Sequence, residues 1–298
     1  MSEVMTTRCG FAAIIGAPNA GKSTLVNKLV GSKVSIVSHK VQTTRARIRA
    51  IYMHDESQVV LVDTPGIFKP RRKLDEAMVE SAWAGAGEAD AVVLIVDARR
   101  GLEDEVIKII DGFKASKTKA MLVLNKIDLI EIEKLMPLAE QCAAAFEFTH
   151  TFMVSAISGS GVAKLGAQLA SLMPIGPWLY PEDQTADVHL RFIASEITRE
   201  KIYERLHDEL PYSSTVETEA WEEKKDGSVK ITQAIFVERD SQKAIVLGKG
   251  GAQIKVLGQL ARKEMEESFE RRVHLFLFVK VRENWAVDPE RLRMMGLR

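Results

Sequence analysis

Eight residues near the start of the chain have the types and the spacing of a phosphate-binding loop. They read Gly16-Ala17-Pro18-Asn19-Ala20-Gly21-Lys22-Ser23, which is a glycine, four variable residues, then glycine, lysine and serine. The glycines let the backbone approach a phosphate closely, and the N–H groups of such a loop point inward at the anion. We therefore expect Lys22 to reach the β- and γ-phosphates of a nucleotide and the Ser23 hydroxyl to bind Mg²⁺.

The segments on either side supply the structural context that this loop needs. Residues 11–15 are apolar throughout, which is typical of a strand buried on both faces. Residues 24–30 are predicted to form a helix that starts at Thr24 and carries Leu25 and Leu29 four residues apart. Because strand, loop and helix occur in this order, a chance match in a glycine turn is the weaker interpretation.

A second polar motif follows another apolar run, at 59–62. The residues Asp63-Thr64-Pro65-Gly66 put a carboxylate at the carboxyl end of a buried strand, where Asp63 would hold Mg²⁺ through water. Gly66 would leave its backbone N–H free for a γ-phosphate. Pro-Gly alone is also the signal of a plain turn, so this motif gains its meaning from the phosphate loop before it.

Further apolar runs predict the remaining strands of one sheet. They lie at 91–96, 120–124 and 152–154, separated by helical stretches such as 103–113 and 131–146. Repeated strand-then-helix order predicts an α/β fold with a mostly parallel sheet, helices on both faces, and the ligand at the carboxyl ends of the strands. At such ends lie the motifs Asn125-Lys126-Ile127-Asp128 and Ser155-Ala156.

These last two motifs favour guanine over adenine. The Asp128 carboxylate can accept hydrogen bonds from the N1–H and 2-amino groups of guanine, whereas adenine offers neither donor and would leave the carboxylate unpaired. The Lys126 stem would lie over the base, and Asn125 would tie this loop to the phosphate loop. The turn at Ser155-Ala156 would donate a backbone N–H to guanine O6.

The pattern changes after residue 173. Three prolines and a glycine within residues 174–181 predict a semi-rigid linker, which we place at 174–185. The elements predicted after it are a helix (186–210), two strands joined at Asp226-Gly227 (212–225 and 228–237), two helices (240–247 and 252–269) and a strand of period two (273–282).

The last two predicted helices are joined by Gly248-Lys249-Gly250-Gly251. Helices joined without side-chain bulk let a single-stranded nucleic acid backbone pass close, and such loops clamp about four nucleotides. Residues 239–282 contain ten Lys or Arg against five acidic residues, which predicts a local basic face. A flexible loop and a second phosphate site are the alternatives, but no strand precedes this loop and no Ser or Thr follows its lysine.

Composition limits the classes of function. A length of 298 residues predicts two domains, and equal numbers of basic and acidic residues, 41 each, exclude a global attraction to nucleic acid. Cys9 and Cys142 lie far apart, which argues against a disulfide framework or zinc site and fits a reducing cytosol. Residues 1–8 contain no apolar signal core and no apolar run is long enough to span a bilayer, so we expect a soluble, cytoplasmic protein.

Together these motifs resemble the Era family of GTPases over essentially the full length of the chain. MnmE and EngA share the GTPase domain, but EngA carries two such domains and this chain one. The resemblance implies a P-loop GTPase domain at 1–173, the linker, an α+β type II K-homology (KH) RNA-binding domain at 186–285 and a tail at 286–298. It rests on Gly16–Ser23, Gln42–Arg45, Asp63–Gly66, Asn125–Asp128, Ser155–Ile157, Gln242–Gly251 and Val279–Trp285.

The resemblance also implies roles for individual residues. Segments 35–50 and 63–80 would be the two switches, and Ser23, Thr44 and Asp63 would hold Mg²⁺. The residues implied for catalysis are Lys22, Thr44, Gly66 and Asn19. Those implied for GTP binding are Gly16, Ala17, Pro18, Asn19, Ala20, Gly21, Lys22, Ser23, Thr24, Asp63, Thr64, Pro65, Gly66, Ile67, Asn125, Lys126, Asp128, Ser155, Ala156 and Ile157. Those implied for RNA binding are Gly248, Lys249, Gly250, Gly251, Lys243 and Lys255.

One position departs from the Ras pattern. Ras-like GTPases carry a glutamine just after Asp-x-x-Gly that orients the attacking water, but here that residue is Ile67, so we expect slow intrinsic turnover. The family resemblance suggests that Asn19 helps to hold K⁺ beside the phosphates, which would do part of an arginine finger's electrostatic work. Shaping the loop is the alternative role for Asn19.

The partners implied by the resemblance are the 3′ end of 16S ribosomal RNA and the 30S ribosomal subunit, in whose assembly the family acts. We expect a monomer, and a peripheral contact with the cytoplasmic face of the inner membrane stays open. Two other classes compete with this interpretation. Asn125–Asp128 counts against a metabolic P-loop kinase, whereas Ile67 keeps open an RNA-binding module with a purely structural nucleotide site.

Overall fold

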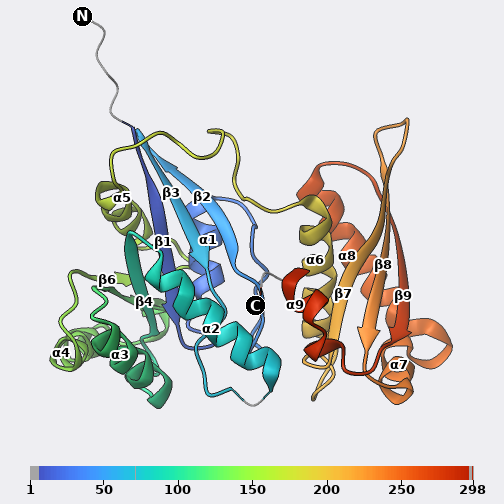
Figure 1. The fold of residues 1–298 in the computed structure, drawn as a ribbon, viewed down its shortest axis with the longest axis horizontal. Coiled ribbons are helices and arrows are strands. Elements are labelled where there is room, and N and C mark those ends of the chain that lie inside the picture. Colours follow the sequence, from blue (N-terminus) through green and yellow to red (C-terminus); the bar gives the residue numbers. More distant parts are fainter. Residues whose placement is uncertain (1–6, 71, 295–296, 298) are drawn as a thin grey trace, which may run out of the picture. The chain divides into compact units, whose positions relative to one another are not determined.

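The computed structural model describes residues 7–70, 72–294 and 297, which divide into two compact units (Figure 1). The first unit contains the chain up to Ser35 and Thr44–Asp187, and the second contains Ile36–Thr43 and Val188–Met294. The predictions about residues 1–8, Arg71 in the second switch and the tail at 286–298 fall partly or wholly outside the described residues.

The first unit is built on a six-stranded sheet in the order β2-β3-β1-β4-β5-β6. All neighbouring strands are parallel except β2, which runs antiparallel to β3. The predicted, mostly parallel α/β sheet is therefore confirmed. The strands are β1 (Arg8–Gly16), β2 (Ile48–His54), β3 (Ser57–Asp63), β4 (Ala91–Asp97), β5 (Met121–Asn125) and β6 (Thr151–Val154).

Helices cover both faces of this sheet, which explains why its central strands are apolar throughout (Figure 1). Along β1, Ala12 and Ile14 join the core formed with α1 and α5, whereas Ala13 and Ile15 join the core formed with α2, α3 and α4. The helices are α1 (Lys22–Val30), α2 (Lys73–Gly87), α3 (Asp104–Ser116), α4 (Leu135–Ala145) and α5 (Val162–Leu172), with short 3₁₀ turns η1 (Ile127–Leu129) and η2 (Ile132–Lys134) before α4.

The proline-rich segment expected to be a linker is hydrogen-bonded along the first unit. Gln58 Oε1 accepts from the backbone N–H groups of Leu179 (2.9 Å) and Tyr180 (3.0 Å), and Gln58 Nε2 donates to the Tyr180 carbonyl (2.8 Å). Trp178 Nε1 donates to the Glu56 carbonyl at 3.2 Å. Because a buried glutamine satisfies three of its backbone groups, this segment belongs to the first unit as far as Asp187.

The second unit is a three-stranded sheet, in the order β7-β8-β9, with helices packed on one face. β7 and β8 are antiparallel, and β8 and β9 are parallel. No described helix is both long enough and apolar enough to cross a membrane. The elements are α6 (Leu190–Arg205), β7 (Ser214–Glu223), β8 (Val229–Val237), α7 (Asp240–Leu247), η3 (Lys249–Gly251), α8 (Ala252–Phe269), β9 (Val273–Val281), η4 (Trp285–Val287) and α9 (Pro289–Met294).

The helix predicted at 186–210 is shorter at both ends, and the sequence prediction was wrong there. Ala186 forms a β-bridge with Ala50, and the Asp187 N–H donates to the Arg49 carbonyl at 2.9 Å. These backbone groups are paired with β2 and so are unavailable to a helix. At the other end α6 stops at Arg205, six residues before Pro211.

Residues 36–43, expected in the first switch, pack on α6 within the second unit. Val37 N–H donates to Glu200 Oε1 at 2.8 Å, and Tyr203 OH donates to the Gln42 carbonyl at 3.1 Å. The Lys40 ammonium donates to the carbonyls of Tyr203 and Leu206, where α6 ends. A lysine at this end also interacts favourably with the helix dipole. The segment is therefore held through backbone groups and the Lys40 side chain.

Candidate nucleotide-binding and RNA-binding sites

The phosphate loop joins β1 to α1 as predicted. Gly16 has no room for a side chain, since a Cβ there would lie 2.5 Å from the Ile95 carbonyl oxygen. Gly21 is the residue before α1, with a φ of 96°, and its carbonyl accepts from the Leu25 N–H at 2.9 Å. Asn19 also has a positive φ, 63°. The loop thus brings its backbone to the N-terminus of a helix, an arrangement that favours anions.

Lys22 is buried under this loop. Its ammonium donates to the carbonyls of Gly16 (3.1 Å) and Ala17 (2.8 Å), and the residue is only 6% exposed. Burial lowers the pKa of Lys22 to about 8, although the nearby Asp63 carboxylate opposes this shift. A phosphate bound in the loop would add further negative charge beside this lysine.

Ser23, Thr44 and Asp63 meet in one oxygen cluster beside Lys22. Ser23 Oγ donates to Asp63 Oδ2 at 2.7 Å and lies 2.9 Å from Thr44 Oγ1. Asp63 Oδ1 is buried and has no hydrogen-bond partner among the described residues, and burial raises the pKa of this carboxyl. Carboxylate and hydroxyl oxygens are the ligands that Mg²⁺ prefers, so the unpartnered oxygen and its neighbours fit this ion.

The second switch begins against the phosphate loop. A Cβ on Gly66 would lie 3.0 Å from the Pro18 nitrogen and 3.2 Å from Lys22 Nζ, so glycine allows this close approach. The Ile67 N–H donates to the Gly16 carbonyl at 3.1 Å. Thr64 Oγ1 donates to the Ile14 carbonyl at 2.7 Å, which anchors the turn that contains Pro65.

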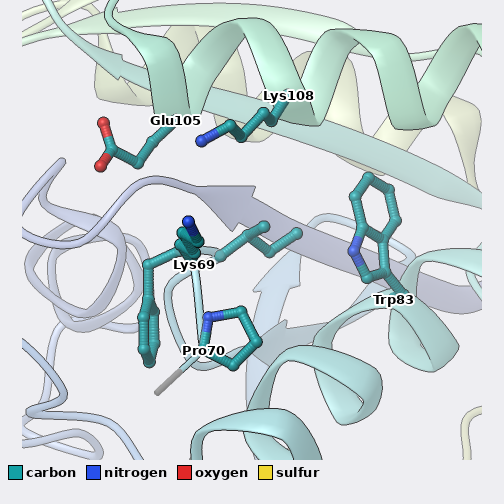
Figure 2. A pocket seen from close by; sticks show the side chains of 7 residues that line it. Lys69, Pro70, Trp83, Glu105 and Lys108 are labelled. Atoms are coloured by element: carbon teal, nitrogen blue, oxygen red, sulfur yellow. The ribbon is translucent and has the colours of Figure 1, made fainter.

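The Ile67 side chain packs into the apolar core and is 6% exposed. It lines a pocket of about 390 Å³ between the second switch, α2 and α3. Figure 2 shows Lys69 and Lys108 extending into this pocket, with Trp83 on the α2 side. An aliphatic, buried side chain cannot orient water, so position 67 does not replace the glutamine of Ras-like proteins.

The loop after β5 is tied to the phosphate loop, as the sequence predicted for Asn125. Asn125 Nδ2 donates to the Ala20 carbonyl at 2.9 Å, and Asn125 Oδ1 accepts from the Ala156 N–H at 3.0 Å. The Ser155 hydroxyl accepts from the Ser158 N–H at 3.1 Å. One amide thus holds together three loops that come from different strand ends. Asp128 and Ile157 are exposed at this edge.

Asp97 is a site residue to which sequence reasoning assigned no role. It directly ends β4, and its Oδ2 accepts from Lys126 Nζ and from Arg99 Nη2, each at 2.7 Å. Burial opposes its ionisation, but hydrogen bonds from Arg99 and Lys126 lower the pKa of Asp97 to about 2. Lys126 Nζ also donates to the Asn19 carbonyl at 2.5 Å. Asp97 therefore holds Lys126 against the phosphate loop. The position of Asp97 at the end of an apolar run was the signal in the sequence by which this role could have been found.

The glycine loop of the second unit joins α7 to α8 as predicted. Gly248, Gly250 and Gly251 have φ values of 71°, 59° and 79°, a conformation that favours glycine. A Cβ on Gly248 would lie 2.7 Å from Gln253 Cβ, whereas Gly250 and Gly251 face open space. The loop therefore presents a bare backbone at the end of α7.

Three lysines around this loop have no ion-pair partner among the described residues. Lys249 lies in the loop, Lys243 on α7 and Lys255 on α8, and Lys249 and Lys255 are exposed. A polyanion can contact these lysines without displacing a carboxylate, whereas Lys263 on α8 lies 3.8 Å from Glu267.

Comparison with known proteins covers both units. A model for 50S ribosome-binding GTPases matches residues 11–126, and a KH domain model matches residues 209–286. The chain is 58% identical over 296 residues to GTPase Era of Brucella suis, covering 99% of this chain and 95% of that protein. It is 62% identical over 291 residues to GTPase Era of Afipia carboxidovorans, covering 98% and 94%.

Two solved structures are also similar over both units. An Aquifex aeolicus Era variant bound to GDP and AlF4⁻ matches with a TM-score of 0.92 and 35% identity, covering 97% of this chain and 99% of the other. An Era complex with MgGDPNP and nucleotides 1506–1542 of 16S ribosomal RNA matches with a TM-score of 0.92 and 36% identity over the same shares.

The buried Lys22 predicts a specific pH dependence of stability. Its folded pKa of about 8 lies below the ordinary 10.5, so between these values the unfolded chain binds more protons. Stability therefore rises with pH through this window, because the cost of burying the charge disappears as Lys22 deprotonates. We expect the nucleotide-free wild type to gain stability relative to Lys22→Met between about pH 8 and 10.5, measured by urea unfolding. A difference that is constant with pH would contradict the shift.

Proposed function

The chain belongs to the Era family of GTPases, and we propose that it couples hydrolysis of GTP to the binding of single-stranded ribosomal RNA by its KH domain. The family shows that its activity is that of a GTPase. The roles of individual residues in this activity are part of our proposal. The main support is the oxygen cluster of Ser23, Thr44 and Asp63 beside buried Lys22. The oxygen atoms of this cluster suit a divalent ion, and the buried lysine beside it suits a phosphate.

We assign the phosphates to the loop at Gly16–Thr24, with Lys22 against the β- and γ-phosphates and the Gly66 N–H at the γ-phosphate. Ser23, Thr44 and Asp63 would hold Mg²⁺, which, when bound, neutralises charge on the phosphate oxygens. Because Ile67 is buried and aliphatic, a group other than its side chain must position the attacking water, and slow intrinsic turnover follows.

We further propose that Asn19 helps to hold K⁺ beside the phosphates. The support is its place in the phosphate loop and its positive φ of 63°. A cation there would stabilise the negative charge that develops in the transition state.

The loop at Asn125–Asp128, which we call the base-recognition loop, generates a prediction about nucleotide choice. Asp128→Asn replaces an acceptor-only carboxylate by an amide, so we expect GTP binding to weaken by about 2 kcal/mol or more. The same variant should favour xanthine nucleotides, whose 2-carbonyl accepts from the new amide. Nucleotide titration calorimetry measures both effects, with exposed Glu133→Gln as the matched control. Equal affinity of the wild type for ATP and GTP would remove Asp128 from base recognition.

Monovalent-ion dependence tests the role of Asn19. Hydrolysis should be faster in potassium than in sodium at equal ionic strength, since the proposed site holds the larger ion. Asn19→Gly suits the positive φ and removes only the side chain, so it should flatten the difference while nucleotide affinity is kept. If the wild-type rate is the same in both ions, Asn19 has only a loop-shaping role.

For the RNA partner, we propose the 3′ end of 16S ribosomal RNA and, through it, the 30S subunit. One relative was solved with nucleotides 1506–1542 of that RNA. In this chain the support is the bare backbone at Gly248–Gly251, with three lysines around it that form no ion pair with any described residue. This combination fits a single-stranded phosphate backbone.

Substitution at the glycine loop should separate RNA binding from nucleotide binding. Gly250 has a φ of 59° and open space around it, so Gly250→Asp should fold and yet repel phosphates. We expect it to lose most affinity for a single-stranded oligonucleotide of the 16S 3′ end, measured by fluorescence anisotropy. Gly250→Asn, which adds bulk without charge, should lose less, and Lys249→Ala should reduce the salt slope by about one unit. Unchanged binding by Gly250→Asp would exclude this loop as the RNA site.

Coupling between nucleotide and RNA is a separate part of the proposal. Thr44 directly follows residues 36–43, whose groups are hydrogen-bonded to α6 of the second unit. Rearrangement of Thr44 with the γ-phosphate would therefore act on this segment. The same RNA titration, run with GDP and with a GTP analogue, measures the coupling factor, and RNA must change GTP affinity by that factor. Identical affinities would remove the coupling and leave the RNA site intact.

For location, we propose the cytoplasm, on the ground of two widely separated, buried free cysteines. We also propose a peripheral contact of the protein with the cytoplasmic face of the inner membrane. Flotation of the protein with anionic lipid vesicles tests it directly.

A further inference from the structure

Two phenylalanines of β9 lie on the face of the second sheet that is opposite its helices. Leu275, Leu277 and Val279 of β9 pack into the cores formed with those helices. Phe276 and Phe278 alternate with them, so they point to the other face, where they are 48% and 51% exposed. Large aromatic side chains exposed side by side on a soluble protein indicate a contact surface.

The neighbours of these rings leave them accessible. Across the β8–β9 register, Phe276 pairs with Thr232 and Phe278 with Ala234, both of which are small. Cationic groups lie at the two ends of the pair. Lys230 Nζ lies 5.8 Å from the Phe276 ring centroid, and Lys280 is two residues after Phe278.

The lysines are bound to carboxylates of β7 by ion pairs that are open to solvent. Lys230 lies 2.9 Å from Glu222, and Lys280 lies 2.5 Å from Glu219, with all four side chains at least one-third exposed. Exposed pairs of this kind contribute only about 0–1 kcal/mol. A phosphate arriving at either lysine can therefore replace its present partner.

The spacing of the rings suits consecutive bases of a single strand. Residues two apart on a strand are about 6.6 Å apart, roughly twice the thickness of a stacked base, so each ring offers its own face. Sheet-borne aromatic side chains bind splayed RNA bases in this way in other RNA-binding domains. β9 is also one of the two edge strands of its sheet, and the face that carries Leu277 and Val279 packs on α7 and α8, which flank the glycine loop.

We propose that Phe276 and Phe278 form a second RNA contact, on which two bases of a strand that passes round β9 from the glycine loop are stacked. This inference rests on the proposed RNA-binding function and extends it to a longer site. Single-stranded RNA fits better than a second copy of this chain, because Lys230 and Lys280 at the two ends of the ring pair suit a polyanion.

The test compares RNAs of two lengths from the 16S 3′ end, of about 4 and about 12 nucleotides, by anisotropy or competition. The double variant Phe276→Leu/Phe278→Leu keeps apolar area and removes the rings, whereas Phe276→Tyr/Phe278→Tyr keeps the rings. We expect the leucine variant to lose about fivefold or more per stacked base on the longer RNA and nothing on the shorter one. The tyrosine variant should bind both RNAs as the wild type does, and GTP hydrolysis without RNA should be unchanged in each.

Each other outcome identifies a different error. Wild-type affinity of the leucine variant for the longer RNA would overturn the second contact while the glycine-loop site stands. Equal losses on both lengths would overturn it too, because they indicate damage to the loop site. Failure of the wild type to bind either RNA would overturn the proposed function together with this inference. If sedimentation equilibrium gave the leucine variant a lower mass than the wild type, and its RNA affinity were intact, the face would be assigned to a second copy of the chain and the RNA contact would be overturned.

Discussion

Burial of two opposite charges beneath the phosphate loop is the constraint on which the first unit depends. Lys22 and Asp63 are both buried. Burial lowers the pKa of Lys22 and raises the pKa of Asp63, so it favours the neutral form of each side chain. Buried charges are costly unless they are paired and hydrogen-bonded. On the proposed assignment, a nucleotide with its divalent ion would bring phosphate to the lysine and a cation to the carboxylate, so that ligand binding would also stabilise this unit.

The same loop is the point at which the other functional segments are held. Ile67 N–H donates to Gly16, Asn125 donates to Ala20, and Lys126 donates to Asn19. The second switch and the base-recognition loop are therefore bonded to the backbone that would hold the phosphates. On the proposed assignment, a change of ligand at the phosphates would act on both segments through these three hydrogen bonds.

The second unit differs from the first in the kind of ligand that it binds, because RNA is a long, flexible polyanion. Its glycine loop presents bare backbone, and the lysines around that loop form no ion pair within the part of the chain that the structure describes. Residues 36–43 pack on α6 of this unit although they belong to the predicted first switch. One stretch of chain thus contributes to the second unit while the residue after it, Thr44, contributes to the oxygen cluster.

The amino-acid sequence by itself determined the sheet, the order of its strands along the chain and the positions of the polar motifs at the ends of its strands. The runs ending at Asp63 and Asn125 are apolar throughout because both faces are buried, and parallel strands bring their carboxyl ends to one edge. Only the tertiary structure decided the role of Asp97, the short α6, the bound proline segment and the place of residues 36–43. Each of these depends on a hydrogen bond between residues far apart in the chain, such as Gln58 with Leu179, and local periodicity carries no information about such pairs.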